Sequence, residues 1–161
     1  RREGPQQVTN PLVGHPAPAF SLTDQHGRQV SLDDLRGTAT LLVFVPFAFS
    51  DTCTNELIDL RDAADLRSRD DLRVVVVSCD SMYTLKAWGD THRFAETLLS
   101  DFWPHGDASR DYGVFNPRKG LATRGTFLID AEGVVRWAVV NPTGEARDVD
   151  DYRREVAALL G

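Results

Sequence analysis

Two nearly continuous apolar runs, separated by one helix-length segment, constrain the fold of this chain more than any other feature. The runs are Leu41–Val45 and Val74–Ser78, and runs of this kind are typical of strands that are covered on both faces of a sheet. The intervening segment has good helix N-cap residues at 50–52 and predicts a helix that continues to about Arg69. Consecutive strand, helix and strand make a right-handed crossover between parallel strands, so the sequence predicts an α/β fold.

Shorter patterns on both sides of this unit predict further strands and helices. Two alternating runs joined by a glycine-containing turn, Phe20–Thr23 and Gln29–Leu32, predict an N-terminal β-hairpin. A second strand–turn–strand pattern, Thr126–Asp130 and Val134–Val139, predicts a late hairpin that adds antiparallel edge strands. The remaining predicted helical segments are Asp33–Arg36, Tyr83–Glu96, Ser109–Tyr112 and Asp150–Leu160.

The size and charge of the chain exclude several classes of protein. Its 161 residues fit one domain, which we expect over residues 11–161. Residues 1–10 are expected to form a flexible N-terminal extension. This extension is the first part of a proline-rich, extended arm that reaches Pro18. The net charge of −6 argues against binding to nucleic acid and to anionic lipid. No apolar run approaches the roughly 20 residues that span a bilayer, and the first ten residues do not resemble a signal peptide. We therefore expect a cytoplasmic protein that does not enter a membrane.

Two cysteines and four histidines limit the disulfide and metal chemistry that the chain supports. Cys53 and Cys79 are too few for a disulfide scaffold and do not have C-x-x-C spacing. The histidines are scattered, whereas structural zinc sites use Cys and His ligands in short clusters. We therefore expect no metal site.

Cys53 lies in the first turn of the predicted crossover helix, where a thiol is most easily ionised. Backbone N–H groups there have no partner within the helix and the helix dipole is positive, so both favour a thiolate. Helix N-termini lower a thiol pKa from about 8.5 to roughly 3.5–7.5. Cys53, Leu57, Leu60 and Ala64 share one predicted helical face, so we expect the thiol to point into the protein body.

The same position suits a buried, inert cysteine, and three other residues favour a reactive one. Pro46 lacks an N–H group and shields the site without competing for hydrogen bonds. Ser50 precedes Cys53 by three residues, which brings its hydroxyl within reach of the thiolate or of a substrate. Arg124 precedes a predicted strand whose end we expect at the same edge of the sheet. A guanidinium there would stabilise a thiolate, although Arg124 taken alone fits a solvent-exposed loop charge better.

The segment around Cys53 resembles the active-site pattern of the peroxiredoxins. Pro46-x-x-x-Ser50-x-x-Cys53 matches that family's Pro, three residues, Thr or Ser, two residues, Cys, and Glu56 matches its common Cys-x-x-Glu. The run Arg124-Gly125-Thr126-Phe127-Leu128-Ile129-Asp130 is similar to the segment that carries the family's essential arginine. The segment Val8–Leu22 resembles the usual opening of the family, and the segments Leu99–Gly106 and Tyr112–Asn116 resemble its one-cysteine AhpE-like class, the actinobacterial alkyl hydroperoxide reductase E type.

This resemblance implies a thioredoxin-like fold, with a central mixed β-sheet flanked by helices and an N-terminal β-hairpin, and a thiol peroxidase activity. Cys53 would be the peroxidatic cysteine, whose thiolate attacks hydrogen peroxide, an organic hydroperoxide or peroxynitrite and becomes a sulfenic acid. Pro46, Ser50 and Arg124 would line its pocket, with Glu56 in a supporting role. The chemistry implied needs no cofactor.

Two other functions fit parts of the same pattern. A thioredoxin-like thiol–disulfide oxidoreductase needs a second cysteine three residues from the first, but Ser50 occupies that position. Such proteins also carry a proline where Arg124-Gly125 stand. A non-enzymatic redox sensor or chaperone-like binding module would have the same sequence, and turnover with excess peroxide separates it from an enzyme.

Cys79 has two interpretations, a small residue at a strand end or a cysteine that resolves the sulfenic acid. A disulfide requires Cα atoms within about 7 Å, and Cys53 lies beyond its strand in a helix, so the first interpretation is favoured. The two resolving positions usual in the family are not cysteines, because Ile58 stands five residues after Cys53 and no cysteine follows Cys79. The resemblance implies a one-cysteine mode with an external reductant, which is mycothiol with mycoredoxin, another thiol or a thioredoxin-like protein.

Four aromatic residues near the predicted site have no assigned role. Phe47, Phe49, Phe102 and Trp103 would either make the mouth of the pocket apolar or serve as core or interface residues, and the second is favoured. The resemblance to the peroxiredoxins also implies a homodimer.

Overall fold

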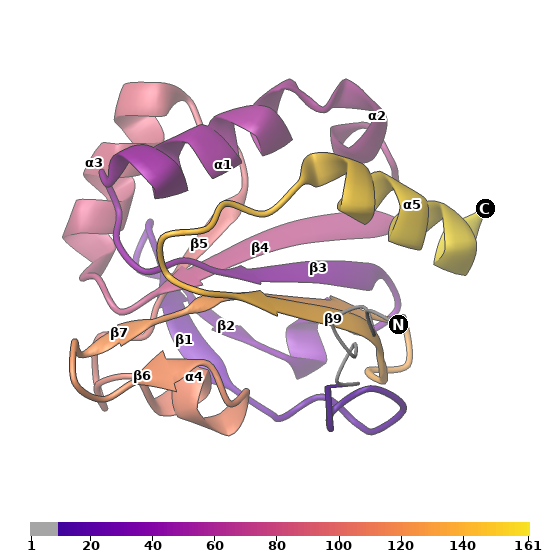
Figure 1. The fold of residues 1–161 in the computed structure, drawn as a ribbon, viewed down its shortest axis with the longest axis horizontal. Helices are drawn as coiled ribbons and strands as arrows, with labels where there is room; N and C mark the ends of the chain where they lie inside the picture. The colour runs from indigo at the N-terminus through magenta and orange to yellow at the C-terminus, as the bar shows by residue number, and fades with distance from the viewer. Residues whose placement is uncertain (1–9) are drawn as a thin grey trace, which may run out of the picture.

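A seven-stranded mixed sheet runs through the computed structural model, which describes residues 10–161 (Figure 1). The order of its strands is β2-β1-β5-β4-β3-β8-β9, and β6 and β7 pair separately. The strands are β1 (Ser21–Asp24), β2 (Gln29–Ser31), β3 (Ala39–Phe44), β4 (Leu72–Ser78), β5 (Thr97–Ser100), β6 (Phe115–Asn116), β7 (Leu121–Ala122), β8 (Arg124–Ile129) and β9 (Val135–Asn141). The helices are η1 (Asp33–Leu35), α1 (Asp51–Asp62), α2 (Ala64–Arg67), α3 (Met82–His92), α4 (Asp107–Asp111) and α5 (Val149–Leu160).

The two apolar runs form β3 and β4 at the centre of the sheet and pair in parallel, as predicted. Their register runs from Ala39 opposite Leu72 to Phe44 opposite Val77. Every residue of β3 is buried, because both faces of this strand are covered. On its other side β3 pairs with β8, which runs antiparallel to it. The start of β8 therefore lies beside the end of β3, where the chain enters α1.

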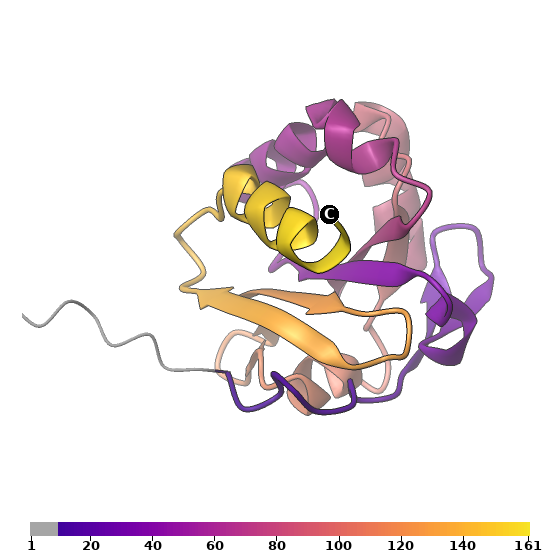
Figure 2. The same cartoon turned by 90° about the vertical axis from the view of Figure 1, so that its right-hand side faces the viewer.

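Two layers cover the sheet. Helices α1, α2, α3 and α5 lie on one face, and α4 with the β6–β7 hairpin lies on the other (Figures 1 and 2). The alternation of side chains along β3 serves both layers: Leu41 and Val43 pack into the core cluster under the helices, whereas Leu42 and Phe44 pack into the cluster on the opposite face. A change in the register of β3 would disturb both clusters.

The crossover helix is broken, which corrects the predicted continuous helix to Arg69. α1 ends at Asp62, Ala63 has a non-helical ψ of 73°, and the chain then forms the short helix α2. The break turns Ala63 and Leu66 into the core and leaves Ala64 exposed. The predicted helical face was therefore wrong at Ala64, because the periodicity of one helix does not continue across the break.

The second predicted helix also ends early, and a strand follows it. The sequence predicted a helix over Tyr83–Glu96, but α3 stops at His92, where Arg93 adopts a left-handed conformation with φ of 58°. The segment Thr97–Ser100 then forms β5 and pairs in parallel with β4. This strand was missed because its apolar part is only two leucines, too short a run to predict a buried strand.

The two predicted hairpins are confirmed, with one change in their placement. β1 and β2 pair antiparallel at one edge of the sheet, and β8 and β9 pair near the other. Of the two strands in the second hairpin, β9 is an edge strand and β8 is not, because β8 lies between β9 and β3. The short strands β6 and β7 were not predicted.

The extended N-terminal arm was wrong for its described part. Residues 11–14 form turns and Pro16 bridges Val134, so this segment lies against the β8–β9 hairpin, with Gly14 N–H donating to Val135 O and Ala17 N–H to Gly133 O, each at 2.8 Å. Most of the predicted flexible extension, residues 1–9, lies outside the described residues.

Helix length and composition bear on membrane insertion. Among the helices of residues 10–161, none is both long enough and apolar enough to cross a bilayer.

Glu96 is a buried carboxylate at the end of the sheet opposite Cys53, just before β5. Its side chain is 1% exposed, and Arg67 Nη1 lies 2.7 Å from its Oε1. Neither carboxylate oxygen has a partner in hydrogen-bond geometry. Burial outweighs the nearby charges of Arg67 and Arg61 and raises the pKa of Glu96 above its ordinary value.

This raised pKa predicts a specific pH dependence of stability. The stabilising contribution of protonated Glu96 is complete below the ordinary glutamate pKa and is lost as the pH rises through the folded-state pKa. We therefore expect Glu96→Gln, which does not ionise, to gain stability relative to wild type between about pH 4 and pH 7. Urea unfolding across this range measures the difference. Glu132→Gln, at an exposed glutamate, is the control, and its free energy of unfolding should change with pH as that of the wild type does. The same pH dependence in Glu96→Gln as in the wild type would contradict the prediction.

Candidate active site

The loop between β3 and α1 carries two of the predicted site residues and ends in a helix cap. Pro46 is buried just after β3. Ser50 is the N-cap of α1, and its Oγ accepts the N–H of Cys53 at 3.3 Å. This bond leaves the hydroxyl hydrogen of Ser50 free to be donated elsewhere. Phe49, which precedes the cap, has φ of 68°, a conformation that is strained for a residue with a bulky side chain.

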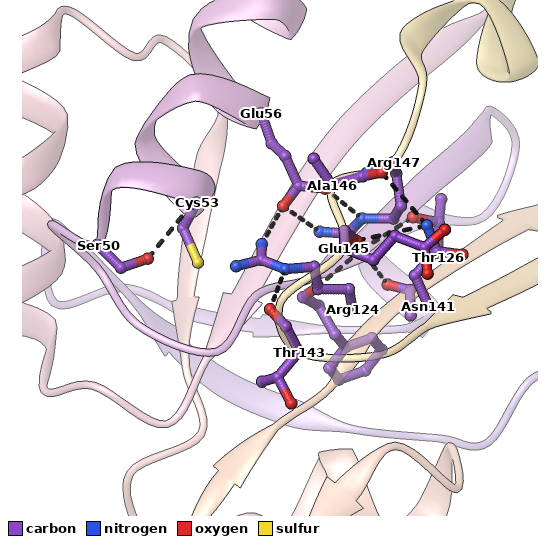
Figure 3. A network of polar contacts seen from close by, with 12 residues as sticks. Ser50, Cys53, Glu56, Arg124, Thr126, Asn141, Thr143, Glu145, Ala146 and Arg147 are labelled. Carbon is purple, nitrogen blue, oxygen red and sulfur yellow. Dashed lines mark hydrogen bonds and ion pairs between the residues drawn. The ribbon is translucent and has the colours of Figure 1, made fainter.

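Cys53 is the third residue of α1 and is completely buried. Leu57 and Leu60 belong to the same core cluster, so the helical face predicted for the thiol is confirmed up to that point. In Figure 3 the sulfur points toward the guanidinium of Arg124. The thiol is therefore sheltered from solvent.

Arg124 is the first residue of β8 and is 2% exposed, so its interpretation as a solvent-exposed loop charge is wrong. The antiparallel pairing of β8 with β3 carries it to the edge where α1 begins. Its Nε donates to the backbone oxygen of Thr143 at 2.6 Å, and its Nη1 donates to Glu56 Oε1. Its other terminal nitrogen is the part of the guanidinium that faces Cys53 in Figure 3.

Glu56 lies one turn after Cys53 on α1 and connects two arginines. Its Oε1 accepts from Arg124 Nη1 and from Arg147 Nη2, the latter at 3.0 Å. Its Oε2 accepts from the backbone N–H and the Nε of Arg147, both at 2.8 Å. Although burial acts to raise the pKa of Glu56, these hydrogen bonds and the two positive charges hold it below the ordinary value. Glu56 is therefore a carboxylate at neutral pH.

Arg147 is a site residue that the sequence analysis missed. It lies just before α5 and is buried, unlike its exposed neighbours Ala146 and Asp148. Besides Glu56, its Nη1 donates to the backbone oxygens of Phe44 and Gly125 at 2.8 Å each. It thus joins the ends of β3 and β8 to α1. A single arginine in a polar segment carries no spacing signal, so nothing in the sequence alone pointed to it.

The charges of this network leave a surplus of positive charge beside the thiol. Arg124 and Arg147 contribute two positive charges and Glu56 one negative charge, and all three side chains are buried. Tyr152 is also near Arg147, but burial raises the pKa of its phenol, so it stays neutral. A thiolate at Cys53 would balance the network. Such a cluster attracts an anion rather than a metal cation.

Metal ligands are not gathered elsewhere either. Between residues 10 and 161 there is no group of three or more His, Cys, Asp and Glu side chains placed to hold a metal ion.

Cys79 follows β4 at the same end of the sheet but occupies a different environment. Its sulfur lies 4.0 Å from Ser109 Oγ of α4, on the face opposite the helix that carries Cys53. Both thiols are free. Burial, reinforced by the charge of Asp101, raises the pKa of Cys79 to about 11. Cys79 is therefore a protonated thiol at neutral pH. A negative charge lies near Cys79, whereas Cys53 lies beside surplus positive charge.

The aromatic residues near the site are exposed, which excludes the core role considered for them. The exposed aromatic side chains at this end of the sheet, which we call the aromatic rim, are Phe47, Phe49, Tyr83, Phe102 and Trp103. Trp103 is the most exposed of them at 80%. Hydrogen bonds connect the segments that carry the rim: Ala48 N–H donates to Asp80 Oδ2, and Ser100 Oγ donates to Asp80 O. The rim therefore surrounds the end of β4, next to the loop that leads to Cys53.

Comparison with known proteins relates most of the chain to one family. Residues 13–138 match the model of the AhpC/TSA family. Alkyl hydroperoxide reductase E of Mycobacterium tuberculosis is 43% identical over 148 residues, which cover 91% of this chain and 97% of the relative. Peroxiredoxin TSA1 of Saccharomyces cerevisiae is 36% identical over 153 residues, covering 89% of this chain and 77% of the relative.

Solved structures show the same relationship. The reduced 2-Cys peroxiredoxin of Plasmodium vivax superposes with a TM-score of 0.84 and 30% identity, covering 92% of this chain and 81% of that one. AhpC of Enterococcus faecalis superposes with a TM-score of 0.83 and 28% identity, covering 92% of both chains. The similarity therefore extends over most of the fold, and the range matched by the family model, residues 13–138, contains both Cys53 and Arg124.

The network predicts that Arg124→Lys weakens the reactivity of Cys53. Lysine keeps the positive charge, but it has one nitrogen in place of the three of the planar guanidinium. It therefore cannot bind Glu56 and Thr143 while also facing the sulfur. We expect the rate of Cys53 oxidation by hydrogen peroxide at neutral pH to fall at least about tenfold, or about 1.4 kcal/mol of barrier, and its pH profile to shift upward. Stopped-flow kinetics measures both. Arg118→Lys, at an exposed arginine, is the control, and an unchanged pH profile in Arg124→Lys would contradict a role for Arg124 at the site.

Proposed function

Because this chain belongs to the AhpC/TSA family of peroxiredoxins and is a thiol-dependent peroxidase, we propose that Cys53 is its peroxidatic cysteine. The family assignment also confirms the expected thioredoxin-like fold. The observation that carries the proposal is the surplus positive charge of Arg124, Arg147 and Glu56 beside a buried thiol at a helix N-terminus.

The chemistry follows from where charge moves. The Cys53 thiolate attacks one peroxide oxygen, an S–O bond forms as the O–O bond breaks, and the cysteine becomes a sulfenic acid. The leaving oxygen takes the negative charge and a proton from solvent, which gives water or an alcohol. The guanidinium of Arg124 and the hydroxyl of Ser50 donate hydrogen bonds to the thiolate and then to the leaving oxygen. Pro46 covers the site without adding a competing donor, and Glu56 supports it by holding Arg124.

The substrates we propose are hydrogen peroxide and organic hydroperoxides, with peroxynitrite as a third. A relative that is 43% identical is named an alkyl hydroperoxide reductase, which supports the organic class. The aromatic rim supports it too, because exposed apolar rings beside the site favour a substrate with an alkyl group.

The geometry argues against a thioredoxin-like disulfide oxidoreductase. Such an enzyme needs a cysteine where Ser50 stands, and here Ser50 Oγ caps α1 through the N–H of Cys53. A redox sensor without turnover would share this site. Membership of a peroxidase family favours the enzyme.

We propose a one-cysteine cycle in which an external thiol reduces the sulfenic acid. The protonated state and opposite orientation of Cys79 argue against its use as a resolving cysteine. The reductant we propose is a low-molecular-weight thiol, mycoredoxin or a thioredoxin-like protein, in the cytoplasm. Members of the family typically form dimers, and we propose a homodimer here, with the aromatic rim as the apolar surface that supports it.

The first prediction tests the nucleophile. We expect Cys53→Ser to abolish peroxide consumption with dithiothreitol as reductant, because the hydroxyl of serine is not ionised at neutral pH. Cys79→Ser is the matched control and should consume peroxide at close to the wild-type rate. Peroxide loss is followed directly, together with the thermal unfolding of each variant. Near wild-type consumption by folded Cys53→Ser would show that the assignment is wrong.

The second prediction tests the one-cysteine cycle. One equivalent of peroxide without added thiol should leave Cys53 as a sulfenic acid, which dimedone traps, and excess peroxide should convert it to a sulfinic acid. Non-reducing peptide mapping by mass spectrometry distinguishes these products from a disulfide. A Cys53–Cys79 disulfide in high yield, absent from Cys79→Ser, would establish internal resolution instead.

A further inference from the structure

We infer that the hydroxyls of Tyr152 and Thr126 position Arg147 for the peroxidase reaction, so that both are positioning residues for Cys53. The inference rests on the proposed role of Cys53 and extends the site to α5, the last helix of the chain.

The two hydroxyls form a buried chain of hydrogen bonds with Arg147. Thr126 Oγ1 accepts from Arg147 Nη1 at 3.1 Å and lies 2.8 Å from Tyr152 Oη. Thr126 is completely buried in β8, and Tyr152 is 4% exposed on α5. Figure 3 shows Thr126 next to the end of the Arg147 side chain. Because both residues are buried, the hydroxyl of Tyr152 relies on Thr126 as its partner, and Thr126 in turn accepts from Arg147.

Arg147 Nη1, which donates to the Thr126 hydroxyl, has its other partners at the ends of two strands. Nη1 of Arg147 also donates to the backbone oxygens of Phe44 in β3 and Gly125 in β8. The remaining nitrogens of the same guanidinium hold Glu56, which in turn holds Arg124. A change in the direction of Nη1 therefore turns the whole guanidinium and moves the Glu56 carboxylate. The effect reaches Arg124, which faces the sulfur.

Packing alone does not require a tyrosine at this position. The ring of Tyr152 lies edge-on to Trp137 with centroids 6.1 Å apart, and a phenylalanine ring would make the same contact. The hydroxyl is an additional polar group in a dry layer, which is costly unless it is bonded. Its partner is Thr126, the β8 side chain that accepts a hydrogen bond from Arg147.

A neutral partner also preserves the charge that the reaction uses. Burial raises the pKa of Tyr152, so its phenol orients Arg147 without adding a negative charge. A carboxylate in its place would cancel the surplus positive charge beside Cys53. The two neutral hydroxyls therefore orient Arg147 without reducing the positive charge that stabilises a thiolate at Cys53.

The test compares hydroxyl deletions at two buried tyrosines. Tyr152→Phe and Thr126→Val each remove one hydroxyl from the chain, and Thr126→Ser keeps it. Tyr112→Phe is the matched control, because Tyr112 is also buried and donates to Pro18 O at 2.8 Å, but packs in the core cluster on the opposite face of the sheet. The readouts are the second-order rate of Cys53 oxidation by hydrogen peroxide from pH 5 to about pH 9, a range that covers thiol ionisation near helix N-termini, and thermal unfolding.

We expect Tyr152→Phe and Thr126→Val each to lower the rate at neutral pH roughly three- to tenfold and to shift its pH profile upward. Thr126→Ser should restore most of the rate. The double variant should be no slower than the slower single variant, since both changes break one connected chain. Tyr112→Phe should lose stability but keep the wild-type rate and profile.

A rate and pH profile in Tyr152→Phe equal to those of Tyr112→Phe would overturn the inference, because the hydroxyl would then serve stability alone. So would full additivity of the two deletions. These outcomes concern the variants and differ from a failure of the proposed function. The proposed function would fail if peroxide oxidised the wild-type chain at a residue other than Cys53.

Discussion

The buried carboxylate of Glu56 holds together the parts of the site that are far apart in the sequence. It accepts hydrogen bonds from Arg124 and Arg147, which lie on β8 and just before α5, while it belongs to α1. A buried ion pair gains stability only with good geometry, and removing one partner costs about 3–5 kcal/mol because a charge is left unpaired. Glu56 therefore connects α1 to β8 and to the segment before α5, in addition to the pairing of β8 with β3. The electrostatic environment of Cys53 depends on the same geometry.

The direction of strands in the sheet explains why two cysteines near one edge have opposite chemistry. β4 is parallel to β3, so Cys79 follows its strand at the same end as the loop that leads to Cys53. β8 is antiparallel to β3, so Arg124 stands at its beginning and reaches that end as well. The sheet separates the two thiols, with the arginines near Cys53 and the Asp101 carboxylate near Cys79. One thiol meets surplus positive charge and the other a negative charge.

Much of this arrangement was predictable where the signal is local. The runs that became β3 and β4, the cap at Ser50 and the position of Cys53 all follow from residues close together in the sequence. The break at Ala63 and the strand β5 were not predictable, because they depend on packing rather than on periodicity. Arg124 was placed near the site by its position before a predicted strand and by its resemblance to a family segment, but taken alone it was interpreted as an exposed loop charge, which its burial contradicts.

The structure also changes the physical basis for proposing that Cys53 is reactive. The sequence analysis relied on the helix N-terminus, but the N–H of Cys53 donates to Ser50 Oγ, so this donor is not available to the sulfur. A helix dipole is equivalent to about half a unit of positive charge at the helix N-terminus, whereas each arginine carries a full unit. The guanidinium of Arg124 faces the sulfur in Figure 3 and belongs to a buried network with one surplus positive charge. The arginines therefore place the larger charge beside the thiol, and helix position chiefly sets the direction of the thiol. This ranking explains why a residue as distant in sequence as Arg147 belongs to the site, although no motif around Cys53 includes it.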